Sequence, residues 1–115
     1  MIPEYVLPAV AARFKALSDA SRLRLLSCLH EKEQSVSELV EKTSRPQPSV
    51  SQNLAQLSAA GLVAARRDGS RMIYRLSDPY VARICDAVCR SVSEHARNKS
   101  EALAGPRPGR SRQRA

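Results

Sequence analysis

The spacing of hydrophobic residues changes at Gly61, and this change limits the fold to helices before the glycine and a β-hairpin after it. The apolar residues of 50–57 recur every three or four positions, which is the spacing of one helix face. After Gly61, apolar and polar residues alternate through 62–66 and 71–76, as in strands, with Asp68-Gly69 between them as a hairpin signal. Glycine readily adopts the left-handed conformation that ends helices, so the sequence predicts a helix that stops at Gly61 and a two-stranded hairpin after it.

Helical spacing of apolar residues recurs outside that helix. A length of 115 residues is enough for one small domain. The pattern predicts a fold that is mainly α with a small β-hairpin, in the order α-α-α-α-β-β-α. The predicted helices are 7–17, 19–29, 35–43 (starting at Ser35 or Ser37), 48–60 and 79–95.

Positive charge is concentrated in two segments. The chain has 19 Lys and Arg against 11 Asp and Glu, a net charge of +8. Residues 45–75 hold five arginines and one aspartate (+4), and residues 97–115 hold six basic groups and one glutamate (+5). This balance favours an anionic partner, either nucleic acid or an acidic membrane surface. Because 105–115 is rich in Pro, Gly, Ser and Arg, we expect a folded domain at 1–96 and a basic, disordered tail at 97–115.

Several classes of protein are disfavoured by what the sequence lacks. No apolar run approaches the ~18 residues of a membrane span and no secretory signal is visible, so we expect a cytoplasmic protein. The last predicted helix is not strongly cationic opposite its apolar stripe, which argues against a membrane-surface role. The sequence has no phosphate loop, paired-carboxylate cleft or nucleophile motif, so we expect neither an enzyme nor a required cofactor.

Two short helices joined by a tight turn and followed by an arginine-rich hairpin indicate a winged helix-turn-helix. A recognition helix needs an apolar face to dock on its domain and an opposite face of short hydrogen-bonding groups that reach base edges. The helix at 48–60 has both, and no acidic residue between Arg45 and Arg67 would repel the backbone of double-stranded DNA. Hairpin arginines suit a wing that lies along phosphates or enters the minor groove. The predicted DNA contacts are Gln47, Ser49, Ser51, Gln52, Asn53, Gln56, Arg66, Arg67 and Arg71.

Four runs of sequence together carry a resemblance to a known family. They are Phe14–Leu26, Ser35–Leu39, Gln47–Leu57 and Ala60–Gly69. In this order they resemble the ArsR/SmtB family, and the resemblance covers about residues 7–96. Members are small bacterial homodimeric repressors that leave operator DNA when an inducer binds or oxidises them. The resemblance implies a homodimer through the first and last helices, a small inducer, and base and backbone contacts from Gln47, Ser49, Ser51 and Gln52.

Three cysteines, Cys28, Cys85 and Cys89, are predicted on helices, and no two form a Cys-x-x-Cys motif. In a cytoplasmic protein a reactive thiol or soft-metal ligand is more usual than a structural disulfide. Cys85 and Cys89 are four positions apart on one helix, with Cβ atoms ~5–6 Å apart against the ~3.5–4.5 Å of a disulfide. Either one could instead bond Cys28 if the second and last helices touch. Each also lies on or beside an apolar stripe, where cysteine commonly packs as a small hydrophobe.

The resemblance narrows the choice of inducer. The Cys-x-Cys motif of metal-sensing relatives is absent where this chain has Val36-Ser37-Glu38. The last helix offers only Asp86, Glu94 and a single His95 in place of the zinc-binding cluster of other relatives. Zinc is therefore only weakly supported as the inducer.

Cysteine placement instead resembles that of the family's sulfide and persulfide sensors. Cys28 lies in a Leu-Leu-Ser-Cys-Leu context, and further cysteines lie in the last helix. We therefore expect thiol modification at Cys28 with Cys85 or Cys89, by reactive sulfur or an oxidant, to shift the second helix and change the spacing of the recognition helices. Two alternatives stay open: arsenite or another soft metal ion bound by all three thiolates, and a constitutive architectural DNA-binding protein whose cysteines only pack.

Overall fold

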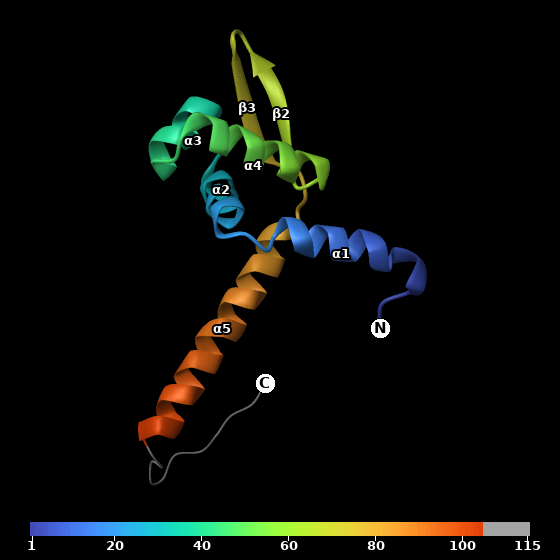
Figure 1. The fold of residues 1–115 in the computed structure, drawn as a ribbon, viewed down its shortest axis with the longest axis vertical. Helices are drawn as coiled ribbons and strands as arrows, with labels where there is room; N and C mark the ends of the chain where they lie inside the picture. Colours follow the sequence, from blue (N-terminus) through green and yellow to red (C-terminus); the bar gives the residue numbers. More distant parts are fainter. Residues whose placement is uncertain (105–115) are drawn as a thin grey trace. The chain divides into compact units, whose positions relative to one another are not determined.

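The helices and strands follow the order that the hydrophobic spacing predicts, with a short 3-10 helix and a short strand added. The computed structural model describes residues 1–104 (Figure 1). The chain divides into two compact units, Met1–Val81 and a second that begins at Ala82. The first unit comprises the 3-10 helix Glu4–Val6, α1 (Leu7–Ala16), α2 (Ala20–Glu31), β1 (Gln34–Ser35), α3 (Val36–Thr43), α4 (Gln47–Ala59), β2 (Val63–Asp68) and β3 (Arg71–Leu76).

Side-chain caps set where α2 and α3 begin. The Asp19 carboxylate accepts a hydrogen bond from the backbone N–H of Arg22 at 3.1 Å, as predicted for the start of the second helix. α3 begins after Ser35 rather than Ser37. Ser35 Oγ accepts from Glu38 N at 3.1 Å, and Glu38 Oε1 accepts from Ser35 N at 2.8 Å. This reciprocal capping box satisfies two backbone donors that would otherwise lack partners.

The C-terminal end of α4 confirms the prediction made from the change of period. Gly61 has a φ of +78°. Leu62 N donates to Leu57 O at 3.0 Å, and Gly61 N donates to Ser58 O at 2.9 Å. This is the Schellman arrangement, which turns the chain out of a helix through a left-handed glycine. The chain therefore leaves α4 directly into β2.

Within residues 1–104, the strands form an antiparallel sheet in the order β1-β3-β2. The sequence does not predict β1, because two residues are too few to show a period; Ser35 pairs there with Ile73. The hairpin is confirmed, but its turn is one residue later than predicted. Asp68 pairs with Arg71, so the turn is Gly69-Ser70, and only Gly69 has a positive φ (+64°). A two-residue turn with glycine first and left-handed suits the twist of the strands.

The core of the first unit lies where α2, α3 and α4 meet the sheet. Leu39, Leu54, Leu57 and Leu62 have no exposed surface, and Val50 is 2% exposed. Burial of these large side chains is the main favourable contribution to folding. Because one side of α4 is fixed in this core, the opposite side, which includes Gln52, is exposed at the surface.

The last helix is α5 (Val81–Ala104), and all of it after Val81 belongs to the second unit. The sequence predicts that this helix ends near His95 and that a disordered tail starts at residue 97. The structure corrects this prediction, because residues 97–104 continue the helix. Residues such as Ala102 and Leu103 have high helix propensity, which explains the extension. The remainder of the predicted tail, 105–115, lies outside the described residues, and none of the helices described is long and apolar enough to cross a bilayer.

Candidate DNA-binding surface

α3, a three-residue turn and α4 form the helix-turn-helix. Ser44 ends α3 in the left-handed region, with a φ of +56°, and its N–H donates to Val40 O at 2.9 Å. Pro46 then precedes α4, and Pro48 lies in its first turn, where no helical partner for its missing N–H is needed. Arg45 lies between these two fixed points, exposed in the turn.

The polar residues of α4 divide into an outward side and two flanks. Successive helical residues are rotated by about 100°, which places Gln52 opposite the buried side formed by Val50, Leu54 and Leu57. Gln52 is exposed. On one flank Gln47 Nε2 donates to Ser51 Oγ at 2.8 Å. These three residues are among the predicted DNA contacts, and the structure places them on the outward side of α4 and on one of its flanks.

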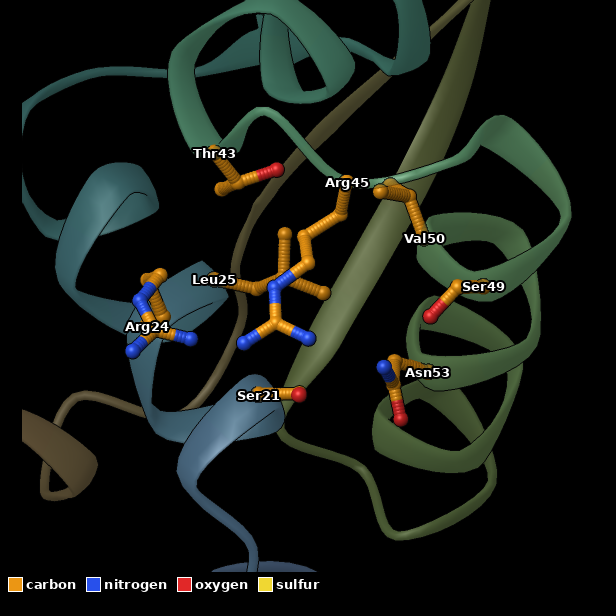
Figure 2. Close-up of a pocket in the computed structure, with 8 residues that line it drawn as sticks. All are labelled: Ser21, Arg24, Leu25, Thr43, Arg45, Ser49, Val50 and Asn53. Atoms are coloured by element: carbon orange, nitrogen blue, oxygen red, sulfur yellow. The ribbon is translucent and has the colours of Figure 1, made fainter.

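Ser49 and Asn53 lie on the other flank, which faces α2. Both are half-buried and line a small pocket with Ser21 of α2 and Arg45 of the turn (Figure 2). The structure thus brings these two predicted contacts together with basic groups that the sequence pattern did not assign to the site. Arg24 of α2 also lines this pocket. The sequence could have pointed to Arg24 only as a basic residue in the second turn of the helix that Asp19 caps.

Gln56, another of the predicted DNA contacts, forms a hydrogen bond within the protein. Its Oε1 accepts a hydrogen bond from Nη1 of Arg22 in α2, at 2.5 Å. The side chain is therefore held toward α2 and not toward the outward side of α4. In this arrangement the amide links two helices.

The arginines of the hairpin do not share one face. Residues directly opposite each other in an antiparallel pair project to the same side, and sides alternate along each strand. Arg66 pairs with Ile73, and Arg71 pairs with Asp68, so both arginines lie on the side of buried Ile73. Arg67 pairs with Met72 and lies on the opposite side. The hairpin, which extends past α4 in Figure 1, thus carries positive charge on both faces.

Arg66 has an intramolecular partner. Its Nη2 donates to Glu33 Oε1 at 2.5 Å, from the hairpin to the segment that precedes β1. This hydrogen bond holds the pKa of Glu33 below its ordinary value of 4.5. Arg67 and Arg71 form no ion pair within residues 1–104. Their charges are therefore available to an anion from outside the protein.

The cysteines differ in accessibility. Cys28 in α2 is 8% exposed, whereas Cys89 in α5 is exposed. Cys85, also in α5, is half-buried, and burial raises the pKa of its thiol. No group of three or more His, Cys, Asp or Glu side chains is placed to hold a metal ion within the described part of the chain.

Comparison with protein families and curated proteins identifies related regulators. A model of a helix-turn-helix domain matches residues 17–66. The chain is 43% identical over 96 residues to the HTH-type transcriptional regulator KmtR of Mycobacterium tuberculosis, covering 83% of this chain and 72% of that protein. It is 40% identical over 87 residues to the HTH-type transcriptional repressor SmtB of the same species, covering 75% of this chain and 64% of that protein. These relatives are regulators of transcription, which agrees with the expectation that the chain is not an enzyme.

A solved structure supports the same fold. The homodimeric winged helix-turn-helix DNA-binding domain of Mb0332 from Mycobacterium bovis, described as a possible ArsR-family transcriptional regulator, aligns with a TM-score of 0.75 at 35% identity. The alignment covers 82% of this chain and 87% of that fragment. The predicted winged helix-turn-helix fold is confirmed by this similarity together with the observed order of helices and strands.

Proposed function

This chain belongs to the ArsR/SmtB family of winged helix-turn-helix transcriptional repressors, and we propose that it binds operator DNA as a homodimer and leaves it when a small inducer acts on its cysteines. The observation that carries DNA binding is the polar outward side of α4. Val50 and Leu54 fix the opposite side of α4 in the core. The outward side offers amide and hydroxyl groups without negative charge, a surface that can read base edges in the major groove.

The side chains of α4 and those of the hairpin have different roles in DNA binding. Gln52, supported by Gln47 and Ser51 on the neighbouring flank, forms hydrogen bonds with bases, because amide groups pair with adenine through two hydrogen bonds. Arg67 and Arg71, on opposite faces of the hairpin, approach phosphates on either side of the wing. Phosphate contacts position the protein on the duplex, and base contacts select the sequence.

The homodimer is proposed to form through α1 and α5. Both helices carry large apolar side chains in contact with solvent: Phe14 in α1 is 56% exposed, and Val88 and Val92 in α5 are 53% and 63% exposed. Exposed apolar residues on one helix face mark an interaction surface. A symmetric dimer pairs two recognition helices, so that each can enter one half-site of a palindromic operator.

The inducer is proposed to be a thiol-modifying species, namely reactive sulfur or an oxidant. Cys89 is the most exposed of the three thiols in the single subunit, and we expect it to react first. Cys85 contributes less thiolate at neutral pH, because burial raises its pKa. Reaction with Cys28 requires α2 to open locally, since this thiol is buried. Two thiols then give up two protons and two electrons to the oxidant and become joined by a disulfide. Where the oxidant is a polysulfide, the bridge can also include sulfur atoms taken from it, and the rest of the polysulfide leaves as a shorter polysulfide or sulfide.

Joining Cys28 to α5 would displace α2 from its place in the core. The Cys28 carbonyl accepts a hydrogen bond from Gln34 Nε2 at 2.7 Å, and the Gln34 side chain is buried. A shift of α2 therefore disturbs the segment that leads into α3. The spacing of the two α4 helices in the dimer changes with it, and operator affinity falls.

DNA selection tests the operator-binding part of the proposal. Duplexes are enriched from a random pool with the full-length protein, and affinities for the selected and an unrelated duplex are then compared. We expect Gln52→Ala to lose about 1–3 kcal/mol of discrimination between the two duplexes. Ser58→Ala, exposed on the last turn of α4, is the matched control and retains the preference. Failure of the wild-type protein to enrich any sequence would contradict the proposal.

Release assays test the inducer. The reduced protein on its selected duplex is titrated separately with polysulfide, peroxide and arsenite, and the products are examined by mass spectrometry. We expect polysulfide or peroxide to release the wild-type protein with Cys28 bridged, and Cys28→Ser to stay bound. Release by arsenite alone, with all three thiols protected, would favour the metalloid alternative. Release by none of the three would favour the constitutive architectural alternative.

A further inference from the structure

A small pocket between α2 and the first turns of α4 has no assigned role (Figure 2). Leu25 and Val50, both 2% exposed, belong to the core and form its apolar base. The rim carries hydroxyl groups from Ser21 and Ser49 and the amide of Asn53. The pocket is small and open, so it suits a single compact group and not a drug-sized molecule.

Two guanidinium groups belong to the same pocket, Arg24 from the second turn of α2 and Arg45 from the turn before α4. Figure 2 shows Arg45 extending from the turn into the space between the two helices. Within residues 1–104, neither arginine makes an ion pair or a side-chain hydrogen bond. By contrast, Arg22, two residues before Arg24, donates hydrogen bonds to Ala16 O, Lys15 O and Gln56 Oε1.

The polar side chains around the pocket all have hydrogen-bond donors, and none of them carries a negative charge. None of the residues lining it within the described chain is acidic. The Thr43 hydroxyl already donates to Leu39 O at 2.7 Å, which leaves its oxygen as a weak acceptor. Two arginines with free donors, two hydroxyls and an amide match the oxygens of a phosphate, because guanidinium groups bind phosphate through paired hydrogen bonds.

We propose that this pocket seats one phosphodiester of the DNA backbone, held jointly by Arg24 and Arg45 and contacted by Ser49 and Asn53. The proposal rests on the DNA-binding function above and refines it. Ser49 and Asn53 then position α4 in the groove and do not read bases. Sequence selection falls to Gln47, Ser51 and Gln52 on the other sides of the helix. A DNA phosphate is favoured over a free anion because the pocket opens beside the recognition helix, where the backbone passes when α4 enters the groove.

Salt dependence of binding supplies the test, because each neutralised phosphate contributes about −0.9 to the slope of log affinity against log salt. Full-length wild type, Arg24→Gln, Arg45→Gln and the double variant are titrated against the selected and the unrelated duplex between about 50 and 200 mM salt. Over this fourfold range the wild type should lose about 3.5-fold more affinity than a variant that lacks one phosphate contact. Lys32→Gln, at the other end of α2, removes one exposed charge as the matched control and leaves the slope unchanged.

Joint binding of one phosphate predicts a specific non-additivity. We expect each single variant to weaken binding to the selected and the unrelated duplex by the same factor. In the double variant, the slope of log affinity against log salt should fall by about one unit in total. A loss of about two units would mean two separate phosphates, and an unchanged slope would mean none; either result overturns the proposal. Asn53→Ala should weaken binding to both duplexes equally, and a selective loss on the selected duplex would also overturn it.

Two further measurements distinguish a bound DNA phosphodiester from a free-anion site and from a failure of operator binding itself. Inorganic phosphate is titrated by calorimetry into the DNA-free protein: absence of saturation at millimolar phosphate supports a backbone phosphodiester, whereas saturable binding lost in Arg45→Gln would identify a free-anion site and overturn the assignment. Failure of operator binding itself is recognised separately, because the wild type would then show no preference for the selected duplex. Circular dichroism and thermal unfolding confirm that each variant is folded.

Discussion

Nη1 of Arg22 donates a hydrogen bond to Oε1 of Gln56 at 2.5 Å, which ties the first turn of α2 to the last turns of α4. The same guanidinium donates from Nε to Ala16 O at 2.6 Å and from Nη2 to Lys15 O at 3.1 Å. Because those two carbonyls belong to the last turn of α1, one arginine joins the ends of three helices. The recognition helix is therefore held at its C-terminal end by the body of the first unit.

This link predicts that Gln56 stabilises the fold and does not read DNA. We expect Gln56→Ala to lower the free energy of unfolding by about 1 kcal/mol, the usual net contribution of a hydrogen bond. Sequence preference should stay at the wild-type level, in contrast to Gln52→Ala. Urea unfolding and binding to the selected duplex measure the two effects. A Gln56→Ala protein of unchanged stability that has lost its sequence preference would contradict this assignment.

The ion pair between Arg66 and Glu33 predicts that the protein restrains one of its own wing arginines. Replacing Glu33 with glutamine removes the ion pair and a negative charge near the hairpin, and leaves Arg66 at most a weaker neutral hydrogen bond. We therefore expect Glu33→Gln to bind both selected and unrelated duplexes more tightly and with a steeper salt slope. Glu31→Gln is the matched control, since Glu31 pairs with Lys42 and forms no ion pair or hydrogen bond with a hairpin residue within residues 1–104. Equal gains in the two variants would show that net charge alone is responsible.

The capping box predicts that the free energy of unfolding decreases in acid because the Glu38 carboxylate becomes protonated. The backbone N–H of Ser35, followed by its hydroxyl, lowers the pKa of Glu38 from the ordinary value of 4.5. A lowered pKa in the folded state means that the carboxylate stabilises the fold fully above 4.5, and that this contribution is lost as the pH falls through the folded value. We therefore expect the stability difference between wild type and Glu38→Gln to be constant near neutral pH and to shrink below this point.

Urea unfolding at a series of pH values measures this difference. Glu41→Gln, on the same helix, is the control, because Glu41 makes no hydrogen bond within the described residues. A difference between wild type and Glu38→Gln that persists at the lowest pH would mean that the carboxylate charge is not what stabilises α3.

Sequence patterns could locate most of the first unit because its signals are local. The Schellman turn at Gly61, the Asp19 cap and the hairpin each depend on a few consecutive residues, and each is recovered. β1 could not be predicted, because it exists only through pairing with β3, which lies far along the chain. The turn at Gly69-Ser70 is set by the same strand register and not by the Asp-Gly dipeptide alone.

The candidate site was predictable in composition but not in its internal contacts. The sequence places polar residues on one helix and arginines on the hairpin, which is enough to indicate a DNA-binding surface. Hydrogen bonds from Arg22 to Gln56 and from Arg66 to Glu33 join residues more than thirty positions apart, so no local pattern reveals them. The same holds for the meeting of Arg24 and Arg45, which depends on how α2 packs against the turn before α4.

The apolar side of α5 predicts how the homodimer can be separated. Val92 is 63% exposed, and a carboxylate at this position in a dimer interface would be desolvated without a partner. We expect Val92→Glu to convert the dimer to a monomer in sedimentation experiments and to weaken operator binding, because a single recognition helix reads only one half-site. Ser93→Glu adds the same charge at the adjacent exposed position, about 100° around the helix, and should leave the dimer intact. A Val92→Glu protein that remains dimeric would show that α5 does not form the interface, and equal dissociation of both variants would show that added charge, and not its place on the helix, separates the subunits.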